Sequence, residues 1–236
     1  MVAAMNRIAL ALAACLVAAP AAAAERSYAV TDFDRIQVDG PYEVALTTGR
    51  SSSAHASGSQ QALDAVTVEV ESGTLRVHAN RSAWGGYPGQ TPGTAKIFLA
   101  TRDLRSAVVR GSGSLAIDRA RGLRVDLSLA GNGRLSVAAV EADNLNLGLL
   151  GAGRISLAGT AKQMRATIQG NGDLDAAGLK VEDAQLATDT SGSIAFQATR
   201  TANVKALGAG EVMVTGAAAC TVEATGSGPV HCGRGR

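Results

Sequence analysis

GSGSLAIDRARGLRVDLSLAGNGRLSVAAVEADNLNLGLLGAGRISLAGTAKQMRATIQGNG, residues 111–172, decides the fold of this chain. In this stretch, and again after it, two glycines flanking one small residue return about every twenty positions. The turns are Gly111-Ser112-Gly113, Gly131-Asn132-Gly133, Gly151-Ala152-Gly153, Gly170-Asn171-Gly172, the degenerate Thr190-Ser191-Gly192, Gly208-Ala209-Gly210 and Gly226-Ser227-Gly228. A fixed period of this length predicts a solenoid, because each repeat is one coil that buries its apolar face only by stacking on its neighbours.

The repeats align around the glycines without gaps. In this alignment, two columns are apolar: the second and the fourth residue after the second glycine of each turn. The first of these columns holds Leu115, Leu135, Ile155, Leu174, Ile194, Val212 and Val230. The positions before and between the apolar columns are mostly polar or small. Alternation with a period of two predicts a β-strand with one buried face. The same alternation precedes each turn, as in residues 145–149, so each coil is expected to carry at least two strands.

We therefore predict an all-β fold, a right-handed parallel β-helix with Gly-x-Gly corners and coils of about twenty residues. The expected hand is the usual hand of parallel crossovers. Stacked coils lie about 4.8 Å apart, and glycine at the corners both reaches positive φ and has no side chain to collide with the next coil. The glycines predicted to be structural for this reason are Gly111, Gly113, Gly131, Gly133, Gly151, Gly153, Gly170, Gly172, Gly192, Gly208, Gly210, Gly226 and Gly228.

Residues 1–24 are predicted to be a secretory signal peptide. Arg7 precedes an apolar run, and four alanines lead to a small-x-small cleavage site before Glu25. A transmembrane anchor fits this alanine-rich run poorly, and no transmembrane segment is expected after cleavage. The protein is therefore expected in the periplasm or outside the cell. An alternative is that Leu12-Ala13-Ala14-Cys15 is a lipobox and that Cys15 anchors an outer-membrane lipoprotein.

The mature chain, residues 25–236, is predicted to be a single domain that is nearly neutral. The sequence has 22 Lys and Arg residues against 20 Asp and Glu residues, and the signal peptide contains only Arg7 among them. Nucleic acid is excluded as a partner because phosphate binding needs a basic surface.

The last repeat contains the two cysteines that remain after cleavage, Cys220 and Cys232, both at inward-facing positions of the alignment. In an oxidising compartment an even pair of cysteines predicts a disulfide. Two buried free thiols are the alternative.

Residues 31–108 lack the regular glycine turns of residues 109–236 but carry strand patterns, so they are expected to form irregular first coils and a cap. The loop from Arg81 to Gly93 interrupts these patterns. Its aromatic side chains, Trp84 and Tyr87, are predicted to bind a ligand, because aromatic side chains supply large contact areas. The alternative is that the loop folds over the cap.

The chain resembles the auto-transporter adhesin head GIN domain family of bacterial envelope proteins. The resemblance lies in Phe33-x-x-Ile36-x-Val38-x-Gly40, in Gly73-x-Leu75-x-Val77, in residues 97–110 and in the glycine coils that follow. It covers nearly all of the mature chain and implies the β-helix fold and an adhesin-like role. Thr101 departs from the family pattern, which often has a proline there.

Parallel β-helices also host polysaccharide lyases and hydrolases, so a carbohydrate-active enzyme is the alternative function. Its best candidate cluster is an outward column formed by Arg134, Arg154 and Asp173, with Asp175 along the same strand face. Solvent-exposed strand faces also carry such residues for solubility alone. We therefore expect that none of these residues is catalytic. The three histidines have no metal-ligand spacing, and no metal or cofactor is expected.

Taken together, the sequence predicts a secreted, non-enzymatic binding or structural module of the cell envelope. Its partner is expected to be an envelope glycan or protein of unknown identity.

Overall fold

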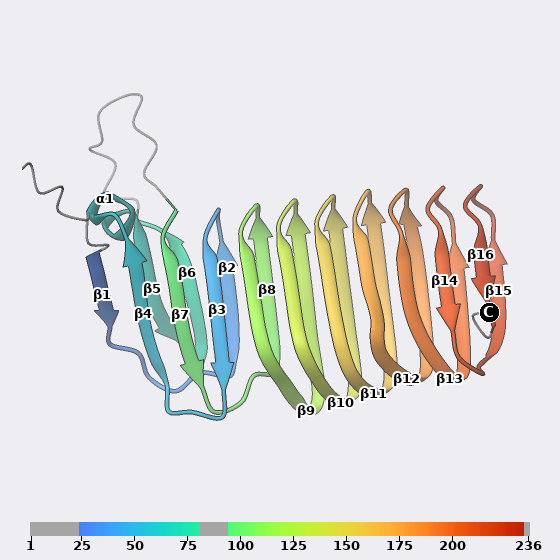
Figure 1. Cartoon of the computed structure of the whole chain (residues 1–236), viewed down its shortest axis with the longest axis horizontal. Coiled ribbons are helices and arrows are strands. Elements are labelled where there is room, and N and C mark those ends of the chain that lie inside the picture. Colours follow the sequence, from blue (N-terminus) through green and yellow to red (C-terminus); the bar gives the residue numbers. More distant parts are fainter. Residues whose placement is uncertain (1–23, 81–93, 234–236) are drawn as a thin grey trace, which may run out of the picture.

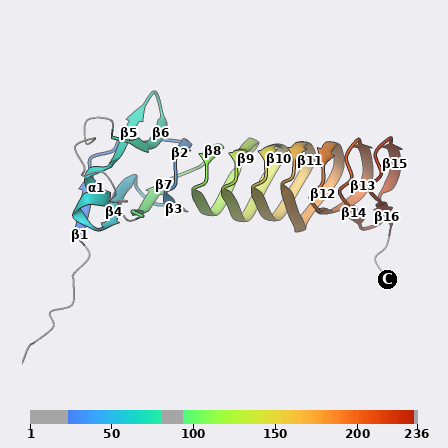
Figure 2. The same cartoon turned by 90° about the horizontal axis from the view of Figure 1, so that it is seen from above.

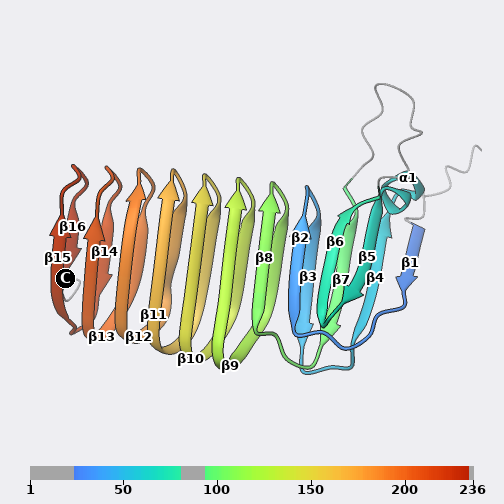
Figure 3. The ribbon, with the colours of Figure 1, turned by 180° about the vertical axis from the view of Figure 1, so that it is seen from behind.

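The computed structural model describes residues 24–80 and 94–233, which form a long β-solenoid of about 6 turns that is 73% strand and 3% helix. Figures 1 and 3 view it from opposite sides and show the coils stacked along its length. Seen from above, in Figure 2, the N-terminal elements lie at one end of the row and β15 and β16 at the other. The predicted β-solenoid is therefore confirmed.

The regular coils are built from long strands that run from one glycine turn to the next. They are β9 (Ser114–Gly131), β10 (Arg134–Gly151), β11 (Arg154–Gly170), β12 (Asp173–Thr190) and the shorter β13 (Ile194–Ala206). Each pairs in parallel with the next, so that Leu135 lies beside Leu115 on one side and Ile155 on the other. Each strand covers one face of the coil, bends at the corner opposite the glycine turn, and covers the second face.

The core lies between these two faces and consists of the inward side chains that the alternating pattern predicted. Leu135, Leu145 and Phe196 are all at most 1% exposed. Burial of such aliphatic and aromatic side chains contributes about 1.5 to 3 kcal/mol each relative to exposure. Stacking therefore supplies the stability that no single coil has.

In the turns at residues 111–113, 131–133, 151–153 and 170–172, the two glycines differ, because only the first has a positive φ. Gly151 has a φ of +115, and a Cβ there would lie 2.6 Å from the backbone oxygen of Gly131 in the coil below. Gly153 lacks the positive φ, but a Cβ there would lie 2.7 Å from the Gly133 oxygen. The first glycine is needed for backbone conformation and close approach, and the second for close approach alone.

Residues 35–48 stack directly on the regular coils. β2 (Arg35–Asp39) pairs with β8 (Ser106–Gly111), and β3 (Glu43–Thr48) pairs with β9, both in parallel. The turn between β2 and β3 brings Gly40, with a φ of +123, beneath Gly111. The column of corner glycines therefore begins at Gly40, within residues 31–108, where the sequence predicted no regular glycine turn. A single glycine is enough to stack on the corner at Gly111.

The next elements outward are later in the sequence. β6 (Thr74–Ala79) pairs in parallel with β2, and β7 (Lys96–Thr101) with β3. Beyond them the pairing becomes antiparallel, with β5 (Val66–Glu71) on β6, β4 (Ser53–Gly58) on β7, and β1 (Ala24–Tyr28) on β4. The expected first coils thus end in antiparallel strands.

A short helix, α1 (Gln60–Asp64), connects β4 to β5 at this end of the solenoid. Ser59 caps it by accepting a hydrogen bond from the Ala62 backbone N–H. Its apolar side chains are buried, with Leu63 1% exposed. The helix therefore packs on the core and closes the N-terminal end, as a solenoid end requires.

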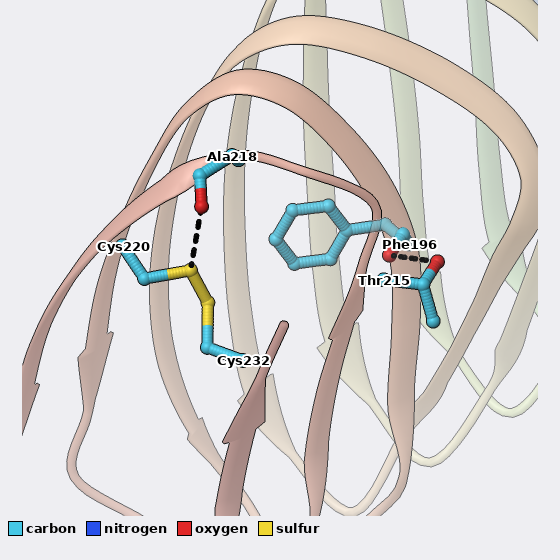
Figure 4. Close-up of a disulfide and its surroundings, with 5 residues drawn as sticks. All are labelled: Phe196, Thr215, Ala218, Cys220 and Cys232. Carbon is cyan, nitrogen blue, oxygen red and sulfur yellow. Dashed lines mark hydrogen bonds between the residues drawn. A yellow bond between two sulfur atoms is a disulfide. The ribbon is translucent and has the colours of Figure 1, made fainter. Parts of the chain in front are cut away.

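The C-terminal end is formed by β14 (Val212–Thr215), β15 (Ala219–Ala224) and β16 (Val230–Cys232). Cys220 and Cys232 form the predicted disulfide, which joins β15 to β16. Figure 4 shows it together with Phe196, whose inward column continues through Val214 to Cys232. Both cysteines are exposed rather than inward-facing as expected, because within the described residues no coil stacks on the last one.

The predicted signal peptide and the lipobox alternative at Cys15 fall outside the described residues, except for Ala24, which begins β1. Within residues 24–80 and 94–233, no helix has the length and apolar character needed to cross a membrane.

Candidate binding surface

The two outer faces of the regular coils carry different side chains. The strand segments that enter the glycine turns form what we call the amide face, which displays Asn144, Asn146, Gln163, Gln169, Gln185 and Asn203 among its outward residues. The segments that leave the turns form the serine face, which displays Ser114, Arg134, Ser136, Arg154, Ser156, Asp173, Asp175 and Ser193. The amide face is therefore the one rich in carboxamides.

One column of the amide face is continuous along the solenoid. Its members lie in register on successive strands, at one residue per coil: Asp126, Asn146, Arg165, Gln185, Asn203 and Thr221. Parallel in-register stacking brings like positions to about 4.8 Å from one another. This column, which we call the amide column, is thus a regular array of hydrogen-bonding groups.

Two hydrogen bonds within the amide column orient its side chains. The Asn146 Nδ2 donates to the Asp126 Oδ1 at 2.6 Å. The Arg165 Nε donates to the Gln185 Oε1 at 3.2 Å. These contacts leave the Asn146 carbonyl oxygen as an acceptor and the Gln185 amide N–H groups as donors for an external partner.

A groove of about 490 Å³ runs beside the amide column on β11 to β13 and β15. Its lining includes Arg165, Gln185 and Asn203 of the column and the smaller Thr167 and Ala187 of the neighbouring column. The groove crosses several coils, and Lys205 and Glu223 of the neighbouring column line its part on β13 and β15.

The cations that line this groove differ in their ionic partners. The Lys205 Nζ lies 3.5 Å from the Glu223 Oε2. Arg165, in contrast, has no carboxylate within salt-bridge distance among the described residues. The groove therefore presents one paired and one unpaired positive charge among neutral amides.

On the serine face, the structure brings together the residues predicted as the best catalytic cluster. Arg134, Arg154 and Asp173 lie in register on adjacent strands, and Asp175 is two residues further along. The Arg154 Nη2 lies 2.8 Å from the Asp173 Oδ2, and the Ser193 backbone N–H donates to the Asp173 Oδ1 at 2.9 Å. The hydrogen bond from Arg154, aided by Ser193, lowers the pKa of Asp173.

This arrangement opposes the requirement for a general acid in glycoside cleavage. Such an acid needs a raised pKa so that it is protonated near neutral pH, whereas Asp173 is held in its ionised form. The contacts around Asp173 instead match an exposed ion pair that links two coils.

Two of the histidines contact different carboxylates. The His78 Nε2 is 2.9 Å from the Glu69 Oε1, and this hydrogen bond raises the pKa of His78. His231 is 3.8 Å from Glu211. Across residues 24–80 and 94–233, no group of three or more His, Cys, Asp or Glu side chains is arranged to hold a metal ion.

The predicted aromatic contacts, Trp84 and Tyr87, lie outside the described residues. The amide face was not predicted, because the alignment before each turn was used for its inward leucines and valines. The signal was present in the same segments: the residues between those leucines, such as Asn144 and Asn146, are amides in several repeats.

The family model described as "Putative auto-transporter adhesin, head GIN domain" matches residues 32–218. No curated protein matches the chain.

Solved structures share the fold at low sequence identity. A "putative adhesin" from Bacteroides fragilis NCTC 9343 is 20% identical with a TM-score of 0.80, and the match covers 89% of this chain and 96% of that one. A "putative lipid binding protein" from Parabacteroides distasonis ATCC 8503 is 21% identical with a TM-score of 0.71, covering 92% and 98%. At these identities the likeness establishes the fold alone.

Proposed function

Since this chain belongs to the auto-transporter adhesin head GIN domain family, we propose that it is a secreted, non-enzymatic binding module of the cell envelope that holds its partner on the amide face. The partner is an envelope glycan or a protein. The observation that carries this proposal is the amide column, which repeats hydrogen-bonding groups in register over successive coils beside an open groove. An array of this kind suits an extended partner held by many weak contacts.

The geometry of the face supports a binding role. Gln185 and Asn203 are exposed, and their carboxamides donate and accept hydrogen bonds. Their backbones belong to strands paired on both sides, which holds the array rigid. A rigid array avoids much of the ordering cost that binding otherwise carries.

Secretion is supported by two independent features. The predicted signal peptide directs export, and the Cys220–Cys232 disulfide is typical of proteins in oxidising compartments. The Arg154–Asp173 ion pair disfavours a general-acid role for the best-placed carboxylate of the serine face, because it keeps that carboxylate ionised and bound to a neighbouring side chain.

The proposal is tested by a binding screen of the mature chain against envelope glycans, peptidoglycan fragments, extracellular matrix proteins and lipid vesicles. A Gln185→Ala, Asn203→Ala double variant is expected to lose the binding that the wild type shows. A matched Ser136→Ala, Ser156→Ala variant of the serine face is expected to keep it. Thermal unfolding of each variant checks that the fold is intact.

A Trp84→Ala, Tyr87→Ala variant in the same screen tests the predicted aromatic contact separately. If that variant alone loses binding, the partner is held by the loop and not by the amide face. A glycan that is consumed during the assay would instead reveal an enzyme.

A further inference from the structure

The amide face combines a chemistry and a spacing that together select one class of ligand. We propose that the amide column and the surface beside it bind a linear, β-1,4-linked hexose polysaccharide that lies along the solenoid axis, with about one sugar per coil; the groove covers the β11 to β13 part of this site. This inference rests on the proposed function and names the ligand of that same face.

The chemistry of the column favours a polyhydroxylated ligand. The Asn146 carbonyl oxygen is left as an acceptor and the Gln185 amide as a donor, by the two hydrogen bonds that orient them. A sugar hydroxyl is both donor and acceptor, so it satisfies either group without a fixed register of charges. In the proposed segment only Arg165 is charged, and the neutral amides of Asn146, Gln185 and Asn203 avoid the desolvation cost that a row of charges would impose on an uncharged partner.

The spacing distinguishes a glycan from a peptide. Contacts recur once per coil, about every 4.8 Å. The side chains on one side of an extended peptide recur only about every 6.7 Å, so a peptide lying along the axis loses register within a few coils. Successive hexoses of an extended β-1,4-glycan are turned over relative to one another, but each carries hydroxyls on both edges. Hydroxyls therefore face the amide column at every sugar, at a spacing close to that of the coils.

The surface beside the amide column also has the shape that a flat sugar chain needs. Next to the amide column, the neighbouring column contains Gly148, Thr167 and Ala187 in register. A Cβ at Gly148 would lie 3.4 Å from the Ser128 Oγ, an ordinary van der Waals contact, so this position has room for a side chain but presents none. Rings of successive sugars can therefore rest on small side chains while their hydroxyls reach the amides.

Lys205 interrupts this small column at the next coil, where it pairs with Glu223. We therefore place the sugar-binding segment on β10 to β13, at Asn146, Arg165, Gln185 and Asn203. The length of the site is then four coils, which a polymer of about four sugars spans.

The test is a length series of linear cello-oligosaccharides titrated into the mature chain by calorimetry. Affinity is expected to rise about fivefold for each added sugar, the effect of one net hydrogen bond, and to level off when the chain spans the four coils. Gln185→Ala and Asn203→Ala are each expected to weaken binding about fivefold. Gly148→Val, which fills the small column without removing an amide, is expected to weaken binding more than either. Ser136→Ala on the serine face is the matched control and is expected to bind as the wild type does.

Equal affinity at every chain length, or unchanged affinity in all three amide-face variants, would overturn this inference. An absence of oligosaccharide binding would also overturn it. If the Gln185→Ala, Asn203→Ala variant nevertheless loses a protein or peptidoglycan partner in the wider screen, the proposed function stands and only the ligand class is wrong. If that variant loses no partner at all, both fail.

Discussion

The amide face and the serine face are built on the same strands, with the same coil spacing, yet they differ in what they can do. On the amide face, Asn146 and Gln185 project groups that retain free hydrogen-bonding capacity. On the serine face, Ser136 and Ser156 are short, and the longer Arg154 and Asp173 bind each other. The comparison teaches that the solenoid specifies where outward groups lie but leaves their chemistry free.

The physical reason is the alternation of the strands. Inward residues such as Leu145 and Ile155 are fixed by packing in the shared core, whereas substitutions on a solvated face usually change stability little. Either face can therefore acquire a binding role without disturbing the fold.

The largest effect on stability is expected at a glycine turn, where the chain passes from the amide face to the serine face. Gly151→Ala would place a Cβ 2.6 Å from the Gly131 backbone oxygen at a φ of +115, so we expect it to lower the free energy of unfolding by about 3 kcal/mol or more. Gly148→Ala, on the amide face, meets no such contact and is expected to change stability by less than about 1 kcal/mol. Denaturant unfolding measures both, and equal losses would show that the turn is not special.

The next effect concerns the disulfide that joins the two faces at the last coil. Cys220 and Cys232 are 12 residues apart, and the loop they close predicts a loss of about 2 to 3 kcal/mol on removal. We expect Cys220→Ser, Cys232→Ser to lower the unfolding midpoint and to remove its sensitivity to reductant. A wild-type midpoint that is unchanged by reductant would contradict this role.

A smaller effect is expected in how pH changes the stability contributed by ion pairs on the two faces. On the serine face, the lowered pKa of Asp173 means that its pair with Arg154 stabilises the fold above the unfolded pKa and loses that contribution as pH falls through the folded pKa. On the strands that extend the amide face, the raised pKa of His78 gives the opposite sign: its bond with Glu69 contributes fully below the unfolded pKa and is lost as pH rises through the folded pKa.

The unfolding of Asp173→Asn and His78→Gln across pH measures this difference. The gap between wild type and Asp173→Asn should close in acid, and the gap for His78→Gln should close in base. Gaps that do not depend on pH would show that neither ion pair contributes.

The smallest effect is expected on the serine face itself. Ser136→Ala and Ser156→Ala should each change the unfolding free energy by less than about 0.5 kcal/mol. In the binding screen they should match the wild type, while Gln185→Ala does not. A serine variant that loses the ligand would move the site to the other face.

Most of the regular fold was predictable because its signals are local. The positions of Leu135 and Ile155 relative to the turns gave both the strand face and the parallel register, and Cys220 and Cys232 gave the disulfide. The ends were less predictable. There, β4 and β5 pair antiparallel with β7 and β6, which follow them in the chain. Their apolar alternation is the same for either direction of pairing.

The candidate site was only partly predictable. Arg134, Arg154 and Asp173 could be placed as neighbours from the repeat alone, but the ion pair between Arg154 and Asp173 required the side chains in space. The amides of the other face were visible in the sequence, and their alignment into one column follows from it, because Asn146, Gln185 and Asn203 stand at the same distance before their turns. Only the groove beside them required the structure.

The sequence by itself determined that this protein is a β-solenoid, because a period set by glycine turns and alternating apolar residues admits few other packings. Only the tertiary structure decided that residues 35–48 insert between the regular coils and β6 and β7, that a helix closes one end, and that amides from separate coils form a groove. The reason is the range of the interactions. Turns and alternation act between residues close in the chain, whereas strand order, end closure and the outer grooves depend on contacts between residues far apart in it.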